Sequence, residues 1–208
     1  MSALLGTTPR PVPLVPAISL YLADEPVELW LDVEAASGRD MEPPFWAFAW
    51  AGGQALARYL LDHPSLVAGR RVIDIASGSG LVAIAAALAG AAEVTAYDID
   101  PLAVTAITVN ASANGVRVRA VCADILDETA DADLVLVADA FYERRFAERV
   151  TQFLLRGRPA FLVGDLGRTY LPRAVLAPLT SYDVTGLGSV EDSDTKRTTI
   201  WTAALFPI

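Results

Sequence analysis

The chain has 208 residues, of which 53% are hydrophobic, and its formal net charge is −9 at pH 7. This length suffices for one α/β domain with a sizeable core, and the hydrophobic content argues against a disordered protein. The acidic balance disfavours nucleic acid as a partner and suits a positively charged one, such as a protein that carries a lysine. The most apolar stretch, residues 81–92, is too short to span a bilayer, so we expect no membrane segment.

Cys122 and His63 are the only cysteine and histidine of the chain. A disulfide framework, a zinc cluster or a multi-histidine site cannot be built from them, so we expect no metal centre. The single cysteine fits a reducing compartment, and the first residues lack the basic region and apolar run of a secretory signal. We therefore expect a cytoplasmic protein.

The N-terminal part of the chain has little regular patterning. Residues 1–16 contain four prolines and are expected to form a flexible arm. Residues 17–67 form the expected N-terminal segment, in which 17–22 are compatible with a short helix and 27–33 alternate like a strand. A further helix is expected over 54–62.

Four aromatic residues crowd the middle of this segment, within six positions of one another. They are Phe45, Trp46, Phe48 and Trp50. They could cover one edge of the sheet, or they could form the lid and wall of a pocket for a flat or cationic ligand.

Short apolar strands and helices alternate through the expected core, residues 68–208. The expected strands are residues 72–75, 93–97, 116–122, 134–138 and 160–163, and the expected helices are residues 80–89, 101–114 and 141–155. This alternation predicts a mostly parallel sheet with helices on both faces. Residues 181–186 and 198–205 resemble strands without a helix between them, which predicts a C-terminal antiparallel hairpin. We expect a single domain.

An aspartate stands at or near the end of each of the five central strands. These residues are Asp74, Asp98, Asp124, Asp139 and Asp165. Because ligands of such sheets bind beyond the carboxyl ends of the strands, five acids in phase with five strands outline a site.

Gly78 and Gly80 follow the first core strand in a turn of small residues. Glycines here let the backbone approach a ligand, and the helix that follows turns its free amides toward it. The spacing Gly78-x-Gly80-x-x-Ala83, with Asp98 about twenty residues further on, partly matches a dinucleotide fingerprint. However, Asp74 would repel a pyrophosphate but suits an ammonium group, and a second half with its own catalytic histidine or lysine is not apparent. A nicotinamide cofactor is therefore disfavoured.

The motifs Asp74-x-x-x-Gly78-x-Gly80, Asp98-Ile99-Asp100-Pro101 and Asp124-Ile125 together resemble the class I S-adenosylmethionine-dependent methyltransferases. The resemblance implies a Rossmann-like, seven-stranded sheet and S-adenosyl-L-methionine as the cofactor. It also implies a role for each residue of these motifs. Gly78 and Gly80 would lie against the methionine part, Asp74 would help to bind its amino group, Asp98 would accept both ribose hydroxyls, Asp124 would contact the adenine amino group, and Ile125 would pack on the adenine ring.

Three segments support a narrower resemblance, to the electron-transfer flavoprotein β-subunit lysine methyltransferases. Residues 44–61 are similar to the segment before the core in that family, and Asp139-Ala140-Phe141-Tyr142-Glu143 is similar to its post-strand motif. Gly164-Asp165-Leu166-Gly167-Arg168 resembles its Gly-Asp-Pro-Gly-Arg, with Leu166 in place of the usual proline. The resemblance implies lysine N-methylation, with a lysine-bearing protein such as the electron transfer flavoprotein β-subunit as the partner.

Asp139 is the expected catalytic residue, because an acid at this strand end can orient the incoming amine and stabilise the charge that it acquires. Tyr142 could add a hydroxyl or a ring wall. Asp139 could alternatively cap the helix expected over 141–155. Trp50 is expected to cover the cofactor. The residues expected at the substrate site are Trp46, Phe141, Asp165 and Arg168, although the two tryptophans could simply pack in the core and the last two residues could form an internal pair.

Two other functions are compatible with the same residues. An aromatic, acidic pocket would also hold a small amine or a pyridine ring, which predicts a small-molecule N-methyltransferase. A domain that kept the fold without turnover would be a non-catalytic cofactor-binding module. The oligomeric state cannot be derived from the sequence.

Overall fold

The computed structural model describes residues 6–23, 26–38, 43–157, 159–185 and 195–204. Its centre is a seven-stranded sheet with the order β5-β4-β3-β6-β7-β9-β8. The strands are β3 (Arg71–Ile75), β4 (Glu93–Asp98), β5 (Arg119–Cys122), β6 (Leu134–Ala138), β7 (Ala160–Asp165), β8 (Leu176–Val184) and β9 (Lys196–Ala203). The first five are parallel, whereas β9 runs antiparallel to β7 and pairs with β8 as a hairpin. The predicted Rossmann-like sheet and its C-terminal hairpin are confirmed.

The strand order reverses between β3 and β6. From β3 the chain moves outward through β4 to β5, and then it returns to β6 on the other side of β3. The loops after β3 and β6 therefore leave the sheet in opposite directions and open a crevice between them. Four of the five predicted strand-end aspartates, Asp74, Asp98, Asp124 and Asp139, meet at this crevice.

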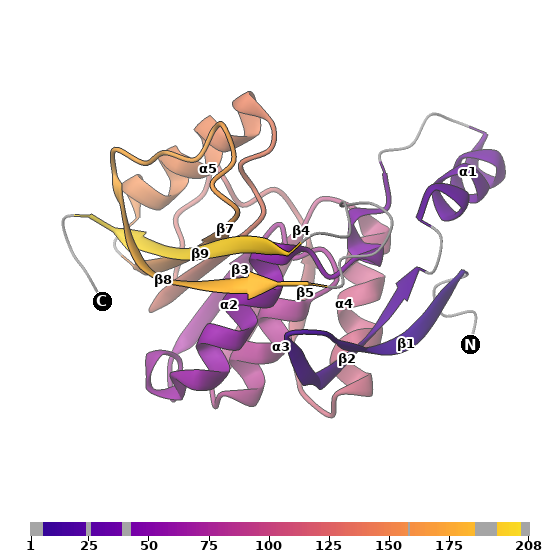
Figure 1. Ribbon diagram of the computed structural model, residues 1–208, viewed down its shortest axis with the longest axis horizontal. Coiled ribbons are helices and arrows are strands. Elements are labelled where there is room, and N and C mark those ends of the chain that lie inside the picture. Colours follow the sequence, from indigo (N-terminus) through magenta and orange to yellow (C-terminus); the bar gives the residue numbers. More distant parts are fainter. Residues whose placement is uncertain (1–5, 24–25, 39–42, 158, 186–194, 205–208) are drawn as a thin grey trace.

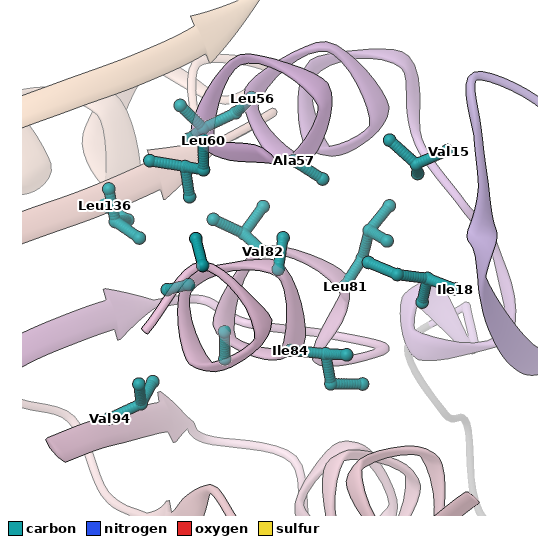
Figure 2. Close-up of a cluster of buried hydrophobic side chains, with 14 of the residues drawn as sticks. Val15, Ile18, Leu56, Ala57, Leu60, Leu81, Val82, Ile84, Val94 and Leu136 are labelled. Carbon is teal, nitrogen blue, oxygen red and sulfur yellow. The ribbon is translucent and has the colours of Figure 1, made fainter. Parts of the chain in front are cut away.

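Helices cover both faces of the sheet (Figure 1). They are α2 (Ala51–Asp62), α3 (Leu81–Leu88) and α4 (Pro101–Ala113) on one face and α5 (Arg144–Arg156) on the other. Figure 2 shows the core of the first face, where Leu56 and Leu60 of α2 meet Val82 of α3 above the sheet. None of the helices in the described ranges has the length and apolar character needed to span a bilayer.

The N-terminal region differs from the expectation for it. Residues 7–12 and 15–23 form a separate antiparallel hairpin, β1 (Thr7–Val12) and β2 (Val15–Ala23), so the predicted flexible arm and the short helix after it are wrong. Residues 1–5 of that arm lie outside the described residues. The hairpin is fixed by apolar residues such as Ile18, which packs against α3 in the core of Figure 2.

Asparagine side chains of α4 complete the outer side of β2. Asn114 accepts a hydrogen bond from the Ser19 amide at 3.0 Å and donates one to the Ser19 carbonyl at 2.7 Å. Asn110 accepts one from the Tyr21 amide at 2.8 Å. These amide groups stand in for a neighbouring strand, which is why β2 is stable without joining the main sheet.

Residues 26–37 form the helix α1 (Pro26–Ser37), where alternation over 27–33 had predicted a strand. In a strand Leu29 and Leu31 would share one face, but here Leu29 is buried and Leu31 is 57% exposed. Leu29 packs in a small cluster with Trp46 and Ala103. Two short 3₁₀ helices, Phe45–Ala47 and Pro64–Leu66, flank α2.

Candidate active site

A cavity of about 1020 Å³ lies at the carboxyl ends of β3, β4, β5 and β6, beside the reversal of strand order. The predicted site residues that line it are Trp46, Trp50, Asp74, Gly78, Asp98, Asp124, Ile125, Asp139, Tyr142 and Arg168. The predicted residues that are not among the lining residues are Gly80, Phe141 and Asp165. The structure therefore brings most of the predicted residues together at one cavity, while three of them lie elsewhere.

The turn after β3, residues 76–80, uses left-handed backbone at Ala76 (φ 50°), Gly78 (φ 54°) and Gly80 (φ 82°). A Cβ on Gly80 would come within 3.2 Å of the Ile107 Cα on α4. Gly80 therefore turns the chain and allows α3 to approach α4, rather than lining the cavity. α3 begins at Leu81, so the free amides of its first turn lie directly behind this turn.

Asp74 is a buried carboxyl group at the floor of the cavity, only 1% exposed. It accepts a hydrogen bond from the Ser77 hydroxyl at 2.5 Å. Burial raises the pKa of Asp74 to about 7, and the bond from Ser77 acts in the opposite direction. A cationic group beside it would favour the ionised form, so the site is suited to an ammonium.

Asp98 ends β4 and holds the turn after β3 in place. Its two carboxylate oxygens accept hydrogen bonds from the amides of Gly78 at 2.8 Å and Asp100 at 3.0 Å. Burial raises the pKa of Asp98, and these two amides act in the opposite direction. Each carboxylate oxygen has a second lone pair, so Asp98 can still accept hydroxyl donors from the cavity.

Asp124 follows β5 and is held by an arginine of α5. Arg149 Nη1 lies 2.8 Å from one Asp124 oxygen, and the Leu126 amide donates to the other at 3.0 Å. The hydrogen bond from Arg149 lowers the pKa of Asp124. Ile125 is 5% exposed and still lines the cavity, where it offers an apolar surface beside a fixed carboxylate.

Asp139 has an unusual backbone conformation at the end of β6. It is left-handed (φ 54°), and its amide donates to the Gly164 carbonyl of β7 at 3.0 Å. Its side chain, 10% exposed, turns back toward α2 and accepts a hydrogen bond from the Gly53 amide at 2.8 Å. Burial raises the pKa of Asp139, and the nearby Arg168 charge acts in the opposite direction.

Asp139 therefore caps α2 and not the helix that follows it. Trp50 is the N-terminal boundary residue of α2 and gives no side-chain cap, so the Gly53 amide finds its acceptor in Asp139. The cap of α5 is Glu143, which accepts hydrogen bonds from the amides of Arg145 and Phe146 at 2.8 and 2.7 Å. The alternative of Asp139 as a cap for the following helix is wrong.

Arg168 bridges Asp139 and Asp165. Its Nη1 lies 2.6 Å from an Asp139 oxygen and 3.1 Å from an Asp165 oxygen. Asp165 has no exposed surface, and its other oxygen accepts the amides of Gly167 at 2.6 Å and Arg168 at 2.7 Å. Asp165 thus supports Arg168 and does not reach the cavity, contrary to its predicted place at the substrate site.

Phe141 is also misplaced in the prediction. It has no exposed surface and packs in the core between the sheet and α5. The next residue, Tyr142, is 53% exposed and lines the cavity. The predicted role for Phe141 at the substrate site is therefore wrong.

Five aromatic rings border the cavity and join its two sides. Ring centroids lie 5.3 Å apart between Phe48 and Trp50, 6.0 Å between Phe45 and Trp50, and 5.7 Å between Phe45 and Tyr142. Phe146 continues the row, 5.9 Å from Tyr142. The Trp50 indole N–H donates to the Phe45 carbonyl at 2.8 Å. These rings provide a wall of the kind that packs against flat or cationic groups.

Trp46 lies deeper than the other aromatic residues. It is 3% exposed and packs with Leu29 and Ala103, while part of its surface lines the cavity. A Cβ on Gly78 would come within 3.8 Å of the Trp46 Cα. Trp46 thus lies next to the turn after β3.

The sequence analysis missed two residues of α5 that line the cavity, Phe146 and Arg149. Their spacing from Tyr142, four and then three residues, could have revealed them, because residues so spaced share one face of a helix. The missed Gly53 amide gave no such signal, since its role depends on how α2 meets β6.

Comparison with known proteins identifies relatives over most of the chain. Residues 55–155 match the sequence model of the PrmA family, described as ribosomal protein L11 methyltransferase. The electron transfer flavoprotein beta subunit lysine methyltransferase of Homo sapiens is 36% identical over 198 residues, covering 90% of this chain and 75% of the human protein. The Xenopus laevis protein of the same name is 34% identical, with 91% of this chain and 80% of that protein covered.

Solved structures with the same fold are methyltransferases of varied substrate. A ribosomal protein L11 methylase from Lactobacillus delbrueckii subsp. bulgaricus aligns with a TM-score of 0.51 at 19% identity, over 71% of this chain and 76% of that one. Magnesium protoporphyrin IX methyltransferase from Synechocystis PCC 6803, determined with bound SAH, aligns with a TM-score of 0.55 at 13% identity, over 72% and 80%. Identities this low show a shared fold.

Proposed function

The chain belongs to the electron transfer flavoprotein beta subunit lysine methyltransferase family and is an S-adenosylmethionine-dependent methyltransferase, and we propose that it methylates the side-chain nitrogen of a protein lysine. The observation that carries the proposal is the Asp139 carboxylate, fixed between the α2 amide and Arg168 at an aromatic-lined cavity. By the names of the relatives, the first substrate to test is the electron transfer flavoprotein beta subunit.

The hydrogen-bond acceptors that line the cavity fit this cofactor. S-adenosylmethionine has an ammonium, two ribose hydroxyls and an adenine amino group, all hydrogen-bond donors, and it has no phosphate. The cavity offers three carboxylates on successive strand ends, Asp74, Asp98 and Asp124. We assign them to the ammonium, the ribose and the adenine amino group, in that order, with Ile125 against the adenine ring. A ligand with a pyrophosphate would be repelled by the same three groups.

We assign the methionine part of S-adenosylmethionine to the turn after β3. Gly78 lines the cavity, and a Cβ there would meet only Trp46 and Phe45 atoms at 3.8 and 3.9 Å. The backbone at Gly78 is thus open to a ligand, and Asp98 fixes it from behind through the Gly78 amide. Trp50 also lines the cavity, and its indole N–H binds the Phe45 carbonyl that lies beside Gly78, so we assign it to the cover of the bound cofactor.

Asp139 acts on the acceptor. Bound S-adenosylmethionine supplies the methyl group on a sulfonium, and the lysine nitrogen must approach it neutral and in line. A carboxylate within the cavity accepts a hydrogen bond from the amine, orients its lone pair and stabilises the positive charge that the nitrogen gains. Tyr142 and Phe45 form the apolar wall along which the aliphatic part of a lysine would lie.

The proposal is tested by incubating the protein with isotope-labelled S-adenosylmethionine and purified electron transfer flavoprotein, followed by mass spectrometry of the labelled peptides. We expect label on lysine of the beta subunit. Asp139→Asn, which keeps the side-chain shape, should lower the rate at least a hundredfold while the Kd for S-adenosylmethionine stays within about threefold of wild type.

Asp131→Asn is the matched control. Asp131 is 91% exposed and pairs with Arg71 on the surface, so the same change there should leave the rate unaltered. Equal rates for wild type and Asp139→Asn would remove Asp139 from the mechanism. Turnover on small amines or pyridines with no labelled protein would make the enzyme a small-molecule N-methyltransferase. Tight binding of S-adenosylmethionine without any turnover would leave a cofactor-binding module.

A further inference from the structure

Arg168 stands between the two carboxylates of the acceptor side. One nitrogen, Nη1, lies 2.6 Å from Asp139 and 3.1 Å from Asp165. The side chain of Arg168 is 19% exposed, that of Asp139 is 10% exposed and that of Asp165 has no exposed surface. Water screens this pair less than a surface ion pair, and the loss of one partner would leave the other charge buried and unpaired.

We propose that Arg168 is a positioning residue of methyl transfer, which holds the Asp139 carboxylate in one orientation and leaves it one net negative charge to share with the acceptor amine. This inference rests on the proposed function. Fully ionised, Asp139, Asp165 and Arg168 together carry one net negative charge. The methylated nitrogen carries one positive charge, so the reaction neutralises the group.

The directions of the two hydrogen bonds to the Asp139 carboxylate support this role. The Gly53 amide holds one oxygen and Arg168 holds the other, so the plane of the carboxylate is fixed at both ends. Each oxygen keeps a further lone pair for an amine. Asp165 fixes Arg168 in turn, since it binds both the guanidinium and the backbone amide of the same residue.

Charge also matters here, because burial raises the pKa of the Asp139 carboxyl and so favours its neutral form. The charged or titratable groups around Asp139 come from several elements: Arg168 and Asp165 at the end of β7 and its loop, Asp74 on β3, and Tyr142 and Glu143 after β6. α2 contributes the Gly53 amide. Arg168 is the cation of this set, and its charge and hydrogen bond lower the pKa of Asp139 while Asp165 raises it.

Two variants therefore move the pH profile in opposite directions. Arg168→Gln removes the cation, so the Asp139 pKa rises and the acid limb of kcat/KM shifts to higher pH. Asp165→Asn removes the competing carboxylate but keeps an oxygen for the Gly167 and Arg168 amides, so the limb shifts to lower pH. A purely structural ion pair would lower the stability of both variants without shifting the limb in opposite directions.

The experiment measures kcat, KM and pH profiles for wild type, Arg168→Gln, Arg168→Lys and Asp165→Asn, with the acceptor that the wild-type enzyme turns over. We expect kcat/KM at neutral pH to fall about ten- to a hundredfold for Arg168→Gln, with partial recovery in Arg168→Lys. The Kd for S-adenosylmethionine should change less than about threefold in all of them.

An acid limb that stays in place in both Arg168→Gln and Asp165→Asn would overturn the inference, and if Arg168→Gln does not fold, an unshifted limb in Asp165→Asn alone would overturn it. An equal loss of cofactor affinity in every variant would also overturn it. Failure of the proposed function is a separate result: the wild-type enzyme would then label a small amine instead of a protein lysine, and the same profiles on that amine would still test Arg168.

Discussion

Gly52 of α2 and Gly164 of β7 touch through their backbones, so that a Cβ on either residue would lie 2.3 Å from the carbonyl oxygen of the other. A Cβ on Gly52 would also come within 2.6 Å of the Asp139 carboxylate. This contact lets the first turn of α2 reach the end of β6, where the Gly53 amide binds Asp139. The close approach of two glycines thus sets the position of the proposed catalytic acid.

Gly52→Ala should both destabilise the protein and slow the reaction. The added methyl must displace the backbone of β7 or the Asp139 side chain, and such overpacking costs about 1–3 kcal/mol of unfolding free energy. Chemical denaturation measures the loss, and kcat should fall with little change in cofactor Kd. In the matched variant Gly53→Ala the new Cβ meets its nearest neighbour at 3.7 Å, so its stability should stay within about 1 kcal/mol of wild type. Equal tolerance of both changes would contradict this reading of the contact.

The sheet and the location of the site were predictable from local patterns. Apolar strands of fixed period alternate with helices, and an aspartate closes each central strand. Because parallel strands bring their carboxyl ends to one edge, the acids had to meet there, and four of the five line the cavity. The fifth, Asp165, points behind that edge to bind Arg168, and its direction could not be read from the strand pattern.

The N-terminal hairpin could not be predicted in this way. Amides of its strand β2 donate hydrogen bonds to the Asn110 and Asn114 side chains, which lie 89 and 95 residues away in the chain. Local propensity cannot reveal a partner that is supplied by side chains so distant in sequence.

The prediction of side-chain directions in the loop after β6 was wrong for a different reason. The left-handed backbone at Asp139 turns the chain so that Phe141 enters the core and Tyr142 faces the cavity. A positive φ at a non-glycine residue costs energy and depends on the surroundings, here the bonds from Gly53 and Arg168 to its side chain. The sequence identified the motif but could not assign its neighbouring aromatic residues to the two sides.

Asn110→Ala should weaken both the fold and the binding of the cofactor. Asn110 is fully buried, accepts the Tyr21 amide and donates to the Ser79 carbonyl at 2.8 Å, so it joins the hairpin to the turn after β3. Loss of both bonds should cost about 2–4 kcal/mol of unfolding free energy. A looser turn should raise the Kd for S-adenosylmethionine by roughly fivefold or more, measured by calorimetry.

Asn114→Ala is the control for this change. Asn114 binds Ser19 of the same hairpin and the Asn110 carbonyl, and among the described residues its side chain has no hydrogen bond to the turn after β3. It should lower stability while the cofactor Kd remains near the wild-type value. A similar loss of affinity in both variants would show that the hairpin as a whole, rather than the bond to Ser79, supports the turn.

The Trp50 ring should contribute more to cofactor binding than the Trp50 N–H does. Trp50→Phe loses the hydrogen bond to the Phe45 carbonyl but keeps an aromatic neighbour for Phe45 and Phe48, whereas Trp50→Ala loses both. Aromatic pairs contribute about 0.5–1.5 kcal/mol each, so Trp50→Ala should raise the cofactor Kd about tenfold and Trp50→Phe only about twofold. If the acceptor KM rises and the cofactor Kd does not, Trp50 belongs to the acceptor wall instead.

Cofactor affinity should depend on pH through Asp74. The pKa of this buried carboxyl lies at about 7 in the free protein, so it is mostly neutral at pH 6 and mostly ionised at pH 8. The ammonium of S-adenosylmethionine prefers the ionised form, and binding therefore releases a proton below pH 7. The Kd should fall by up to about tenfold per unit as the pH rises from 5.5 to 7 and then level off. Calorimetry in two buffers of different ionisation enthalpy measures the proton released.

Asp74→Asn separates the effect of this carboxyl on cofactor affinity from that of Asp98. Burial raises the pKa of Asp98 as well. The variant should bind S-adenosylmethionine more weakly than wild type at pH 7.5 and show a flatter profile between pH 5.5 and 7. The pH dependence of its free energy of unfolding tests the protonation of Asp74 independently of cofactor binding. The pKa of Asp74 is about 7 in the folded chain and 3.8 ordinarily, so the folded protein holds a proton that the unfolded chain has released, and the wild type loses stability as the pH rises from about 4 to 7 and then levels off. Relative to wild type, Asp74→Asn should thus be more stable at pH 8 than at pH 5, and an equal stability difference at the two pH values would mean that Asp74 is ionised in the free protein throughout this range.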